Sequence, residues 1–419
     1  MKKPELVSPA GNLEKLKIAV LYGANAVYLS GERYGLRASA DNFNNDEIKE
    51  GVEFAHARRC RVYVTLNALM HDEDLNGLKE YCKFLQAIDV DAVIVSDPGV
   101  LGLVKLHSNL PVHISTQASC LNVFSAKFWK KQGAQRIVVG RELSINEASR
   151  IQEVADIDTE MFVHGSMCMA YSGHCAISNY TSGRDANRGG CVQSCRFGYS
   201  QGLRRGKNIN GNGRSGTLLH FLSSKDLFGL FLVPVFFEKK ICALKIEGRM
   251  KSSLYVAVVT SAYRQAIDAY ANGAWNGELI EDLIDLLDYV PHRDYTEASL
   301  LRPAGMDSVY QENKSTLLNT SKDMLGIVLE SDDSKLLIRN YQSLKQGDDI
   351  ELIGFNGDRI EIRVKSLRNV LGNSVDAVRQ ESLAILPPLK GVTPFQILVK
   401  TASRSMSGSV SSGVQVNAD

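Results

Sequence analysis

Four of the eight cysteines fall in one short stretch of the chain, with the spacing C-x6-C-x15-C-x3-C: Cys168, Cys175, Cys191 and Cys195. Four thiolates from one segment can form an all-sulfur ligand set, which suits structural zinc or an iron–sulfur cluster. Zinc ribbons and knuckles usually carry paired cysteines only a few residues apart, and the first gap here is longer. The spacing therefore indicates a shared metal centre and favours a cluster, with zinc as the alternative.

The alternative for any single cysteine is a place in the core, because cysteine is among the most buried residue types. Close grouping argues against that interpretation for the set of four. It suits the remaining cysteines, which lie on strand or helix patterns without matched spacing: Cys60, Cys82, Cys120 and Cys242.

The same region is basic and aromatic. From Arg184 to Arg214 the chain carries seven basic side chains and the single acid Asp185. Basic groups beside aromatic rings suit phosphate contacts and base stacking on single-stranded RNA loops, whereas a solvated, glycine-rich loop explains the composition equally well. The aromatic residues are Tyr171, Tyr180, Phe197 and Tyr199, and the candidate RNA contacts are Arg184, Arg188, Arg196, Arg204 and Arg205.

Short β-branched runs alternate with helical patterns up to about residue 250, which is typical of βα units around a parallel sheet. Eight such strands predict an α/β fold, a (β/α)8 TIM-like barrel, with a doubly wound open sheet as the alternative. The predicted strands are Glu5–Val7, Ala26–Leu29, Val62–Leu66, Ala92–Val95, Val112–Ser115, Arg136–Val139, Met161–Val163 and Ala243–Ile246.

The seventh unit is interrupted by a long cysteine-bearing insertion, about residues 165–242, and long loops inside compact domains are usually functional. We predict a barrel over residues 1–290, a linker over 291–321 and a disordered Ser/Gly-rich tail over 403–419. Between linker and tail, short strands at regular spacing predict a small antiparallel β-barrel over 322–400.

Polar residues that follow the predicted strands are the candidate active site, because the strands of such a barrel end at the catalytic face. Guanidinium and ammonium groups there could bind a carboxylate, and the acids and a histidine could move protons. The substrate-binding candidates are His113, Gln117, Arg141, Lys245 and Arg249; the catalytic candidates are Glu142, His164 and Glu247.

Composition limits the class of protein. Hydrophobic residues make up 44% and charged residues 23% of the chain, and the net charge is +1, so any RNA-binding surface is a local patch. The most apolar stretch, Leu227 to Phe237, is well short of the roughly 20 residues of a membrane span, and no signal peptide is evident. We expect a soluble, cytoplasmic protein with reduced cysteines.

Several segments together resemble the peptidase U32 family: LVSPAGNLEKLKIAVLYGANAVYLSG near the start, HISTQAS, RELS, EMFVHGSMCMAYSGHCAISNY, SGRDANRGGCVQSCR and LKIEGRMKS. The resemblance covers about residues 4–400. It is strongest to the branch that acts in prephenate-dependent tRNA hydroxylation, which makes 5-hydroxyuridine at the wobble position. Two segments depart from the family pattern, the unusually apolar Leu227–Phe237 and the tail beyond Ser403.

The resemblance implies oxygen-independent hydroxylation of RNA and a 4Fe-4S iron–sulfur cluster on the four cysteines. It implies the tRNA anticodon arm and prephenate or a similar small carboxylate as partners, and a homo- or hetero-oligomer with a U32 paralogue. Two alternatives remain, a metal-dependent, collagenase-like peptidase and a noncatalytic, zinc-stabilised RNA-binding factor. The sequence has no HExxH helix, G-x-S-x-G elbow, P-loop or Rossmann fingerprint, so a conventional peptidase or nucleotide enzyme is unsupported.

Overall fold

Eight parallel strands close into a barrel in the computed structural model, which describes residues 2–36, 41–200, 218–311 and 322–401. The last barrel strand pairs with both the first and the seventh, and this closure confirms the TIM-like barrel and rules out the open sheet. The barrel strands are β1 (Glu5–Pro9), β2 (Ala26–Leu29), β3 (Arg61–Leu66), β4 (Ala92–Val95), β5 (Val112–Ile114), β6 (Arg136–Val138), β7 (Asp158–Ser166) and β11 (Ala243–Ile246).

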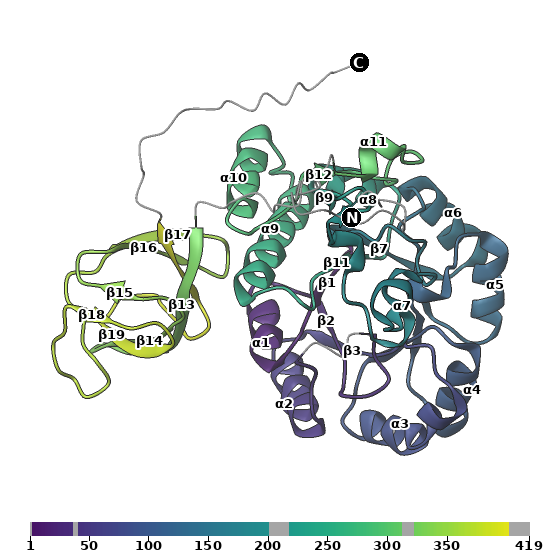
Figure 1. Cartoon of the computed structure of the whole chain (residues 1–419), viewed down its shortest axis with the longest axis horizontal. Coiled ribbons are helices and arrows are strands. Elements are labelled where there is room, and N and C mark those ends of the chain that lie inside the picture. The colour runs from purple at the N-terminus through teal and green to yellow at the C-terminus, as the bar shows by residue number, and fades with distance from the viewer. Residues whose placement is uncertain (1, 37–40, 201–217, 312–321, 402–419) are drawn as a thin grey trace, which may run out of the picture.

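Helices surround the barrel as an outer ring (Figure 1). Most begin at a side-chain cap, as when Asn44 and Ser144 accept from the backbone three residues on, which satisfies otherwise unpaired N–H groups. These caps fix the helix starts beside the carboxyl ends of the strands. The helices are α1 (Leu13–Leu21), α2 (Asn45–His56), α3 (Leu78–Ala87), α4 (Pro98–His107), α5 (Val123–Lys131), α6 (Ile145–Ala155), α8 (Val233–Glu238), α9 (Ser253–Ala271) and α10 (Gly277–Leu287).

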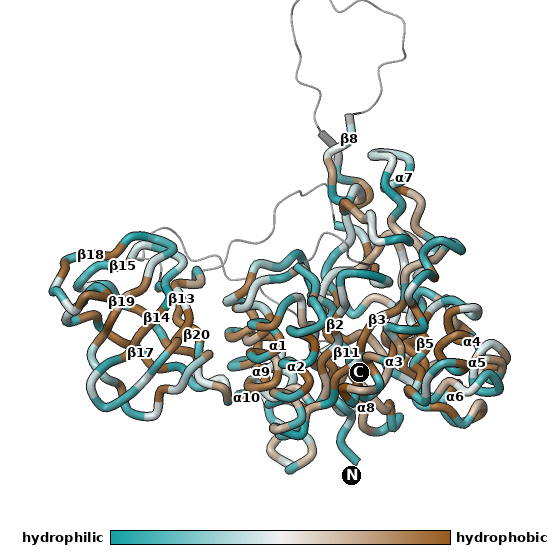
Figure 2. The backbone as a smooth tube through the Cα atoms, turned by 90° about the horizontal axis from the view of Figure 1, so that it is seen from below, coloured by the Kyte–Doolittle hydropathy of each residue, from teal (hydrophilic) through white to brown (hydrophobic). Residues whose placement is uncertain are grey.

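The insertion between β7 and β11 rises from the barrel mouth, carrying α7 (Ile177–Ser182) and β8 (Tyr199–Ser200) (Figure 2). It returns through β9 (Leu218–Leu219) and β10 (Asp226–Phe228), and β10 pairs antiparallel with the end of β7. The apolar stretch Leu227–Phe237 forms β10 and α8, and Leu230, Val233 and Phe236 are fully buried. Its unusual hydrophobicity is therefore explained by burial in the barrel wall.

The predicted linker region extends the sheet that contains the barrel strands, because β12 (Tyr295–Thr296) pairs with β10. The short helix α11 (Met306–Val309) follows it. The second domain is antiparallel, as predicted, with strands in the order β17-β16-β20-β13-β14-β19. The predicted tail, 403–419, lies outside the described residues. The strands of this domain are β13 (Lys322–Ser331), β14 (Leu336–Asn340), β15 (Leu344–Lys345), β16 (Asp349–Ile353), β17 (Arg359–Arg363), β18 (Ala377–Val378), β19 (Ser382–Leu386) and β20 (Ile397–Thr401).

The second domain packs beside α1, α9 and α10 (Figure 1). The fully buried hydroxyl of Tyr22, the residue after α1, donates to the carbonyl of Ile353 at 2.8 Å and accepts from the N–H of Ile397 at 3.2 Å. Tyr289 donates to Glu351 at 2.6 Å across the same contact. Buried hydrogen bonds of this kind fix the second domain against the side of the barrel that carries α1, α9 and α10. In the described part of the chain, no helix combines the length and apolarity that crossing a bilayer requires.

Candidate active site at the barrel mouth

A cavity of about 350 Å³ opens at the carboxyl ends of the barrel strands, beneath the insertion. This volume is within the range of small-molecule sites, roughly 300–1,000 Å³. The wall combines neutral polar groups from β3 and β5 with cations that follow β6 and β11. Its polar lining includes Thr65, Asn67, Ser115, Gln117, Arg141, Lys245, Glu247, Arg249 and Lys251.

Arg141 and Lys245 are held on the cavity wall by acids. The Arg141 guanidinium lies 3.1 Å from Glu247 and stacks 3.7 Å from the centre of the Phe162 ring. Lys245 donates to Glu160 at 2.7 Å, so its ammonium is fixed at the cavity floor. The structure thus brings together on one cavity five of the predicted substrate-binding and catalytic residues: Gln117, Arg141, Lys245, Glu247 and Arg249.

Below the cavity, Glu160 is the centre of a buried charge network. Its carboxylate accepts from Lys245 and, at 3.1 Å, from Arg136, which also lies 2.6 Å from Glu5. Burial alone would raise the pKa of Glu160, but the charges of Lys245 and Arg136 lower it to about 2. Glu160, Lys245, Arg136 and Glu5 therefore each pair with an opposite charge, as buried charges require.

The four cysteines of the insertion gather beside this cavity. Cys168, Cys191 and Cys195 line it, and the pKa of Cys175 is raised by burial and by the charges of Cys168 and Cys191. The amide of Asn187 holds Cys175 from both sides, because it accepts from the backbone N–H at 3.4 Å and donates to the carbonyl at 3.0 Å.

A single-ion site and an iron–sulfur cluster require different sulfur positions. Four sulfurs bound to one tetrahedral zinc lie about 3.8 Å apart, since each Zn–S bond is about 2.3 Å. Among the residues that the structure describes, no three His, Cys, Asp or Glu side chains are grouped as ligands of one metal ion. An iron–sulfur cluster binds each thiolate to a separate iron, so its sulfurs lie farther apart. Which centre the four cysteines hold stays a prediction.

The predicted RNA-contacting arginines differ in their contacts and in their exposure. Arg196 is folded back: it donates to the carbonyl of Met167 at 2.9 Å and to the carbonyl of Ser224. Because Met167 precedes Cys168, this guanidinium ties the backbone beside two of the cysteines together. Arg188 pairs with Asp74 at 2.8 Å, and Arg184 is exposed. Arg204 and Arg205 lie outside the described residues.

The insertion is attached to the loops around the mouth. Glu142, a predicted catalytic acid, accepts from the backbone N–H of Ser172 at 2.9 Å and does not line the cavity. At Gly173, where φ is +87°, an added Cβ would lie 2.1 Å from the carbonyl oxygen of Gln117. Only glycine allows this close approach. Glu142 therefore positions the insertion in this structure, and a catalytic role for it stays a prediction.

His113 and His164 are both buried and lie outside the cavity lining. His113 packs edge-on against Tyr63, with ring centres 4.7 Å apart, and His164 lies 3.4 Å from the Tyr263 hydroxyl. Burial lowers the pKa of each to about 3. The structure therefore holds both as neutral rings, and their predicted substrate-binding and catalytic roles stay predictions.

These two histidines predict loss of stability in mild acid. A group with a depressed folded pKa stabilises the fold above its unfolded pKa, about 6.5, and the stabilisation is lost as the pH falls toward the folded value. Between pH 7 and pH 5 each histidine is expected to cost about 2 kcal/mol of unfolding free energy. Urea unfolding at several pH values measures this.

Variants separate the two histidines from other titrating groups such as His292, whose pKa is raised by Asp288 despite burial. The variants His113→Gln and His164→Gln are each expected to remove about half of the fall in unfolding free energy that the wild type shows between pH 7 and pH 5. An unchanged fall in both variants would contradict the assignment.

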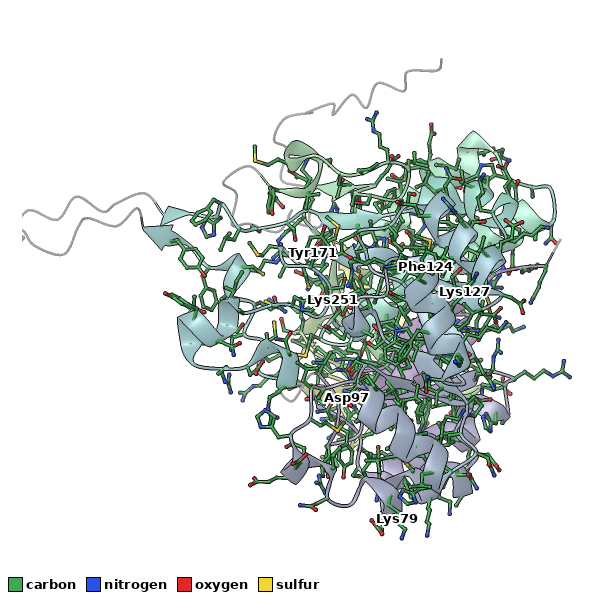
Figure 3. All side chains as sticks on the ribbon, turned by 90° about the vertical axis from the view of Figure 1, so that its right-hand side faces the viewer. Lys79, Asp97, Phe124, Lys127, Tyr171 and Lys251 are labelled. Atoms are coloured by element: carbon green, nitrogen blue, oxygen red, sulfur yellow. The ribbon has the colours of Figure 1, made fainter. Side chains whose placement is uncertain are left out.

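Sequence reasoning missed Lys251 and Arg293, which also line the cavity. Lys251 lines the cavity at the barrel mouth, whereas Lys127 lies on the outer helix α5; both are labelled in Figure 3. Lys251 belongs to the segment LKIEGRMKS, which could have signalled it. Nothing in the local pattern marks Arg293, which reaches the cavity from the segment before β12 and pairs with Asp226 at 3.5 Å.

Comparison with known proteins places this site in a family. The model of "Peptidase family U32" matches residues 11–309. The chain is 41% identical to "tRNA hydroxylation protein P1" of Bacillus subtilis (strain 168), over 90% of each chain. It is 38% identical to the "23S rRNA 5-hydroxycytidine C2501 synthase" of Escherichia coli K12, over 63% of this chain and 39% of that one. It is 30% identical to a "Collagenase" of Porphyromonas gingivalis, over 66% and 68%. The chain belongs to peptidase family U32.

Proposed function

We propose that this protein is a tRNA-hydroxylating enzyme, which converts the wobble uridine to 5-hydroxyuridine without molecular oxygen. The names of its relatives support hydroxylation of RNA, at 41% identity for the tRNA hydroxylation protein of Bacillus subtilis. The observation that carries the proposal is the meeting of three cysteines with a cationic cavity at one barrel mouth. A redox centre and a small acid can thereby lie side by side. Cytoplasmic tRNA is the expected substrate.

In this proposal Cys168, Cys175, Cys191 and Cys195 hold a 4Fe-4S cluster, which would supply one-electron chemistry when bound. The chain's own contribution is to hold the four thiolates in place. Asn187 fixes the backbone of Cys175, and Arg196 connects the backbone beside Cys168 and Cys195. Arg196 is therefore proposed as a support of the centre and not as an RNA contact.

The hydroxyl donor is proposed to be prephenate or a similar small carboxylate, bound in the cavity. Cations dominate its charged lining, and guanidinium groups bind carboxylates with two parallel hydrogen bonds. Arg141 and Arg249 are the guanidinium groups proposed to bind it, and the Gln117 amide is a neutral partner in the same lining. Glu247 lines the cavity and is the acid best placed to move a proton.

The RNA is proposed to bind the outer surface of the insertion through the anticodon arm. Tyr180 on α7 is 96% exposed and Tyr171 is 62% exposed, while exposed Arg184 follows on the same segment. Exposed rings next to basic groups suit unstacked bases of a loop. An opened uridine could reach the cavity beneath this surface.

Anaerobic purification with metal analysis tests the centre, and mass spectrometry of tRNA nucleosides from a deletion strain tests the reaction. We expect about four iron and four sulfide per chain, as in one 4Fe-4S cluster. We expect 5-hydroxyuridine to disappear in the deletion strain and to return with the wild-type gene. A colourless protein with one zinc per chain, or unchanged tRNA together with peptide cleavage, would contradict the proposal and favour one of the two alternatives.

A further inference from the structure

We propose that Lys251 binds a carboxylate of the small acid in the cavity, a role that rests on the proposed function. The residue follows β11 in the chain and lines the cavity together with Cys168 and Glu247. It was not among the residues that the sequence singled out. The inference concerns binding, and it assigns no proton transfer to Lys251.

The ammonium of Lys251 differs from its neighbours in lacking an acid partner. Arg141 pairs with Glu247 at 3.1 Å and Lys245 with Glu160 at 2.7 Å. Within the residues that the structure describes, Lys251 Nζ makes no hydrogen bond or ion pair, and it lies 5.0 Å from the centre of the Tyr255 ring. The ring covers one side of the ammonium and leaves its N–H groups for a ligand.

The surrounding charges favour an anion at this point. Arg196 and Arg293 repel the ammonium, and Asp226 and Glu247 attract it. Asp226 already pairs with Arg293 and Glu247 with Arg141, so neither acid is devoted to Lys251. Burial lowers the pKa of Lys251, which shows that the charged form lacks sufficient compensation. A bound carboxylate would supply the missing negative charge beside the Lys251 ammonium.

As the partner of the Lys251 ammonium, a carboxylate fits better than the cysteine thiolates or an RNA phosphate. The charges of Cys195 and Cys168 act on Arg196, whereas the largest charge effects on Lys251 come from Asp226, Arg293, Arg196 and Glu247. A cavity of about 350 Å³ accepts a small acid. Exposed Arg184, on the outer surface of the insertion, is the better placed cation for a nucleic-acid backbone.

Three variants test the inference by titration calorimetry with prephenate and by fluorescence anisotropy with an anticodon stem-loop RNA. Lys251→Met removes the charge and keeps much of the side-chain length, Lys251→Arg keeps the charge, and Lys127→Met removes an equal charge from the exposed outer helix α5. We expect Lys251→Met to weaken prephenate binding about 10- to 100-fold, as for loss of a charge-assisted hydrogen bond. RNA affinity should stay within about twofold, and Lys127→Met should match the wild type for prephenate.

The outcomes separate this inference from the proposed function. Wild-type prephenate affinity in Lys251→Met would overturn the inference alone. Weaker RNA binding with a smaller salt dependence and unchanged prephenate binding would also overturn it, because Lys251 would then be a phosphate contact. A wild-type protein that hydroxylates tRNA without binding prephenate would contradict the proposed donor and this inference with it. Partial recovery by Lys251→Arg would support a role based on charge.

Discussion

Replacing Cys168, Cys175, Cys191 or Cys195 by alanine is expected to lower tRNA hydroxylation at least about 100-fold, because loss of even an outer partner of a metal ligand typically costs about 10- to 100-fold. Each of these cysteines lies at the cavity or interacts with those that do. Nucleoside mass spectrometry of tRNA from complemented deletion strains measures the effect, and iron content of the purified variants measures loss of the centre.

The matched control is Cys82→Ala on α3. Cys82 is fully buried, and burial raises its thiol pKa to about 11, so it behaves as a small apolar side chain. This variant is expected to keep both iron and hydroxylation. Normal hydroxylation in any of the four alanine variants would refute the assignment of that cysteine to the catalytic centre.

Replacing Glu160 by glutamine is expected to destabilise the barrel by about 3–5 kcal/mol, the usual cost of leaving a buried charge without its partner. Glu160 is fully buried and pairs with both Lys245 and Arg136. Its removal leaves Lys245 without its acid partner inside the barrel, whereas Arg136 keeps its pair with Glu5. Urea unfolding at pH 7 gives the change in midpoint and in unfolding free energy.

Asp156→Asn is the matched control, since it removes an acid only four positions earlier. Asp156 pairs with Lys130 on the surface and is 92% exposed there. Exposed pairs of this kind add little to stability, so the unfolding midpoint should not change measurably. Equal midpoints for Glu160→Gln and the wild type would show that the buried network does not stabilise the fold.

The positions of the barrel strands were predictable because strands of a parallel sheet are buried on both faces and read as short apolar runs. Each of the eight predicted runs overlaps an observed strand, as Ala26–Leu29 does exactly over β2. Closure of the barrel could only be favoured, since it depends on β11 pairing with β1 more than two hundred residues away. The spacing of the cysteines likewise predicts a common site.

Roles of individual polar residues were harder to predict, because local sequence does not show where a side chain points. Arg196 reads as a surface cation, yet its guanidinium folds back onto two carbonyls. His164 follows the pattern of a strand-end catalytic group, but it lies behind the wall among Phe228, Tyr263 and Tyr295. The segment LKIEGRMKS could have drawn attention to Lys251, but it does not show that the ammonium lacks an acid partner among the described residues.

The contact of Gly173 with the Gln117 carbonyl joins the cysteine-bearing segment to a residue that lines the cavity. Because the two backbones are in close contact, a shift of the cysteine-bearing segment would also shift Gln117 in the cavity wall. Substitutions that adapt the outer surface of the insertion to a different RNA would therefore have to leave the Gly173–Gln117 contact intact. The outer surface at α7 can change in this way while the cavity and the cysteine-bearing segment keep their relative positions.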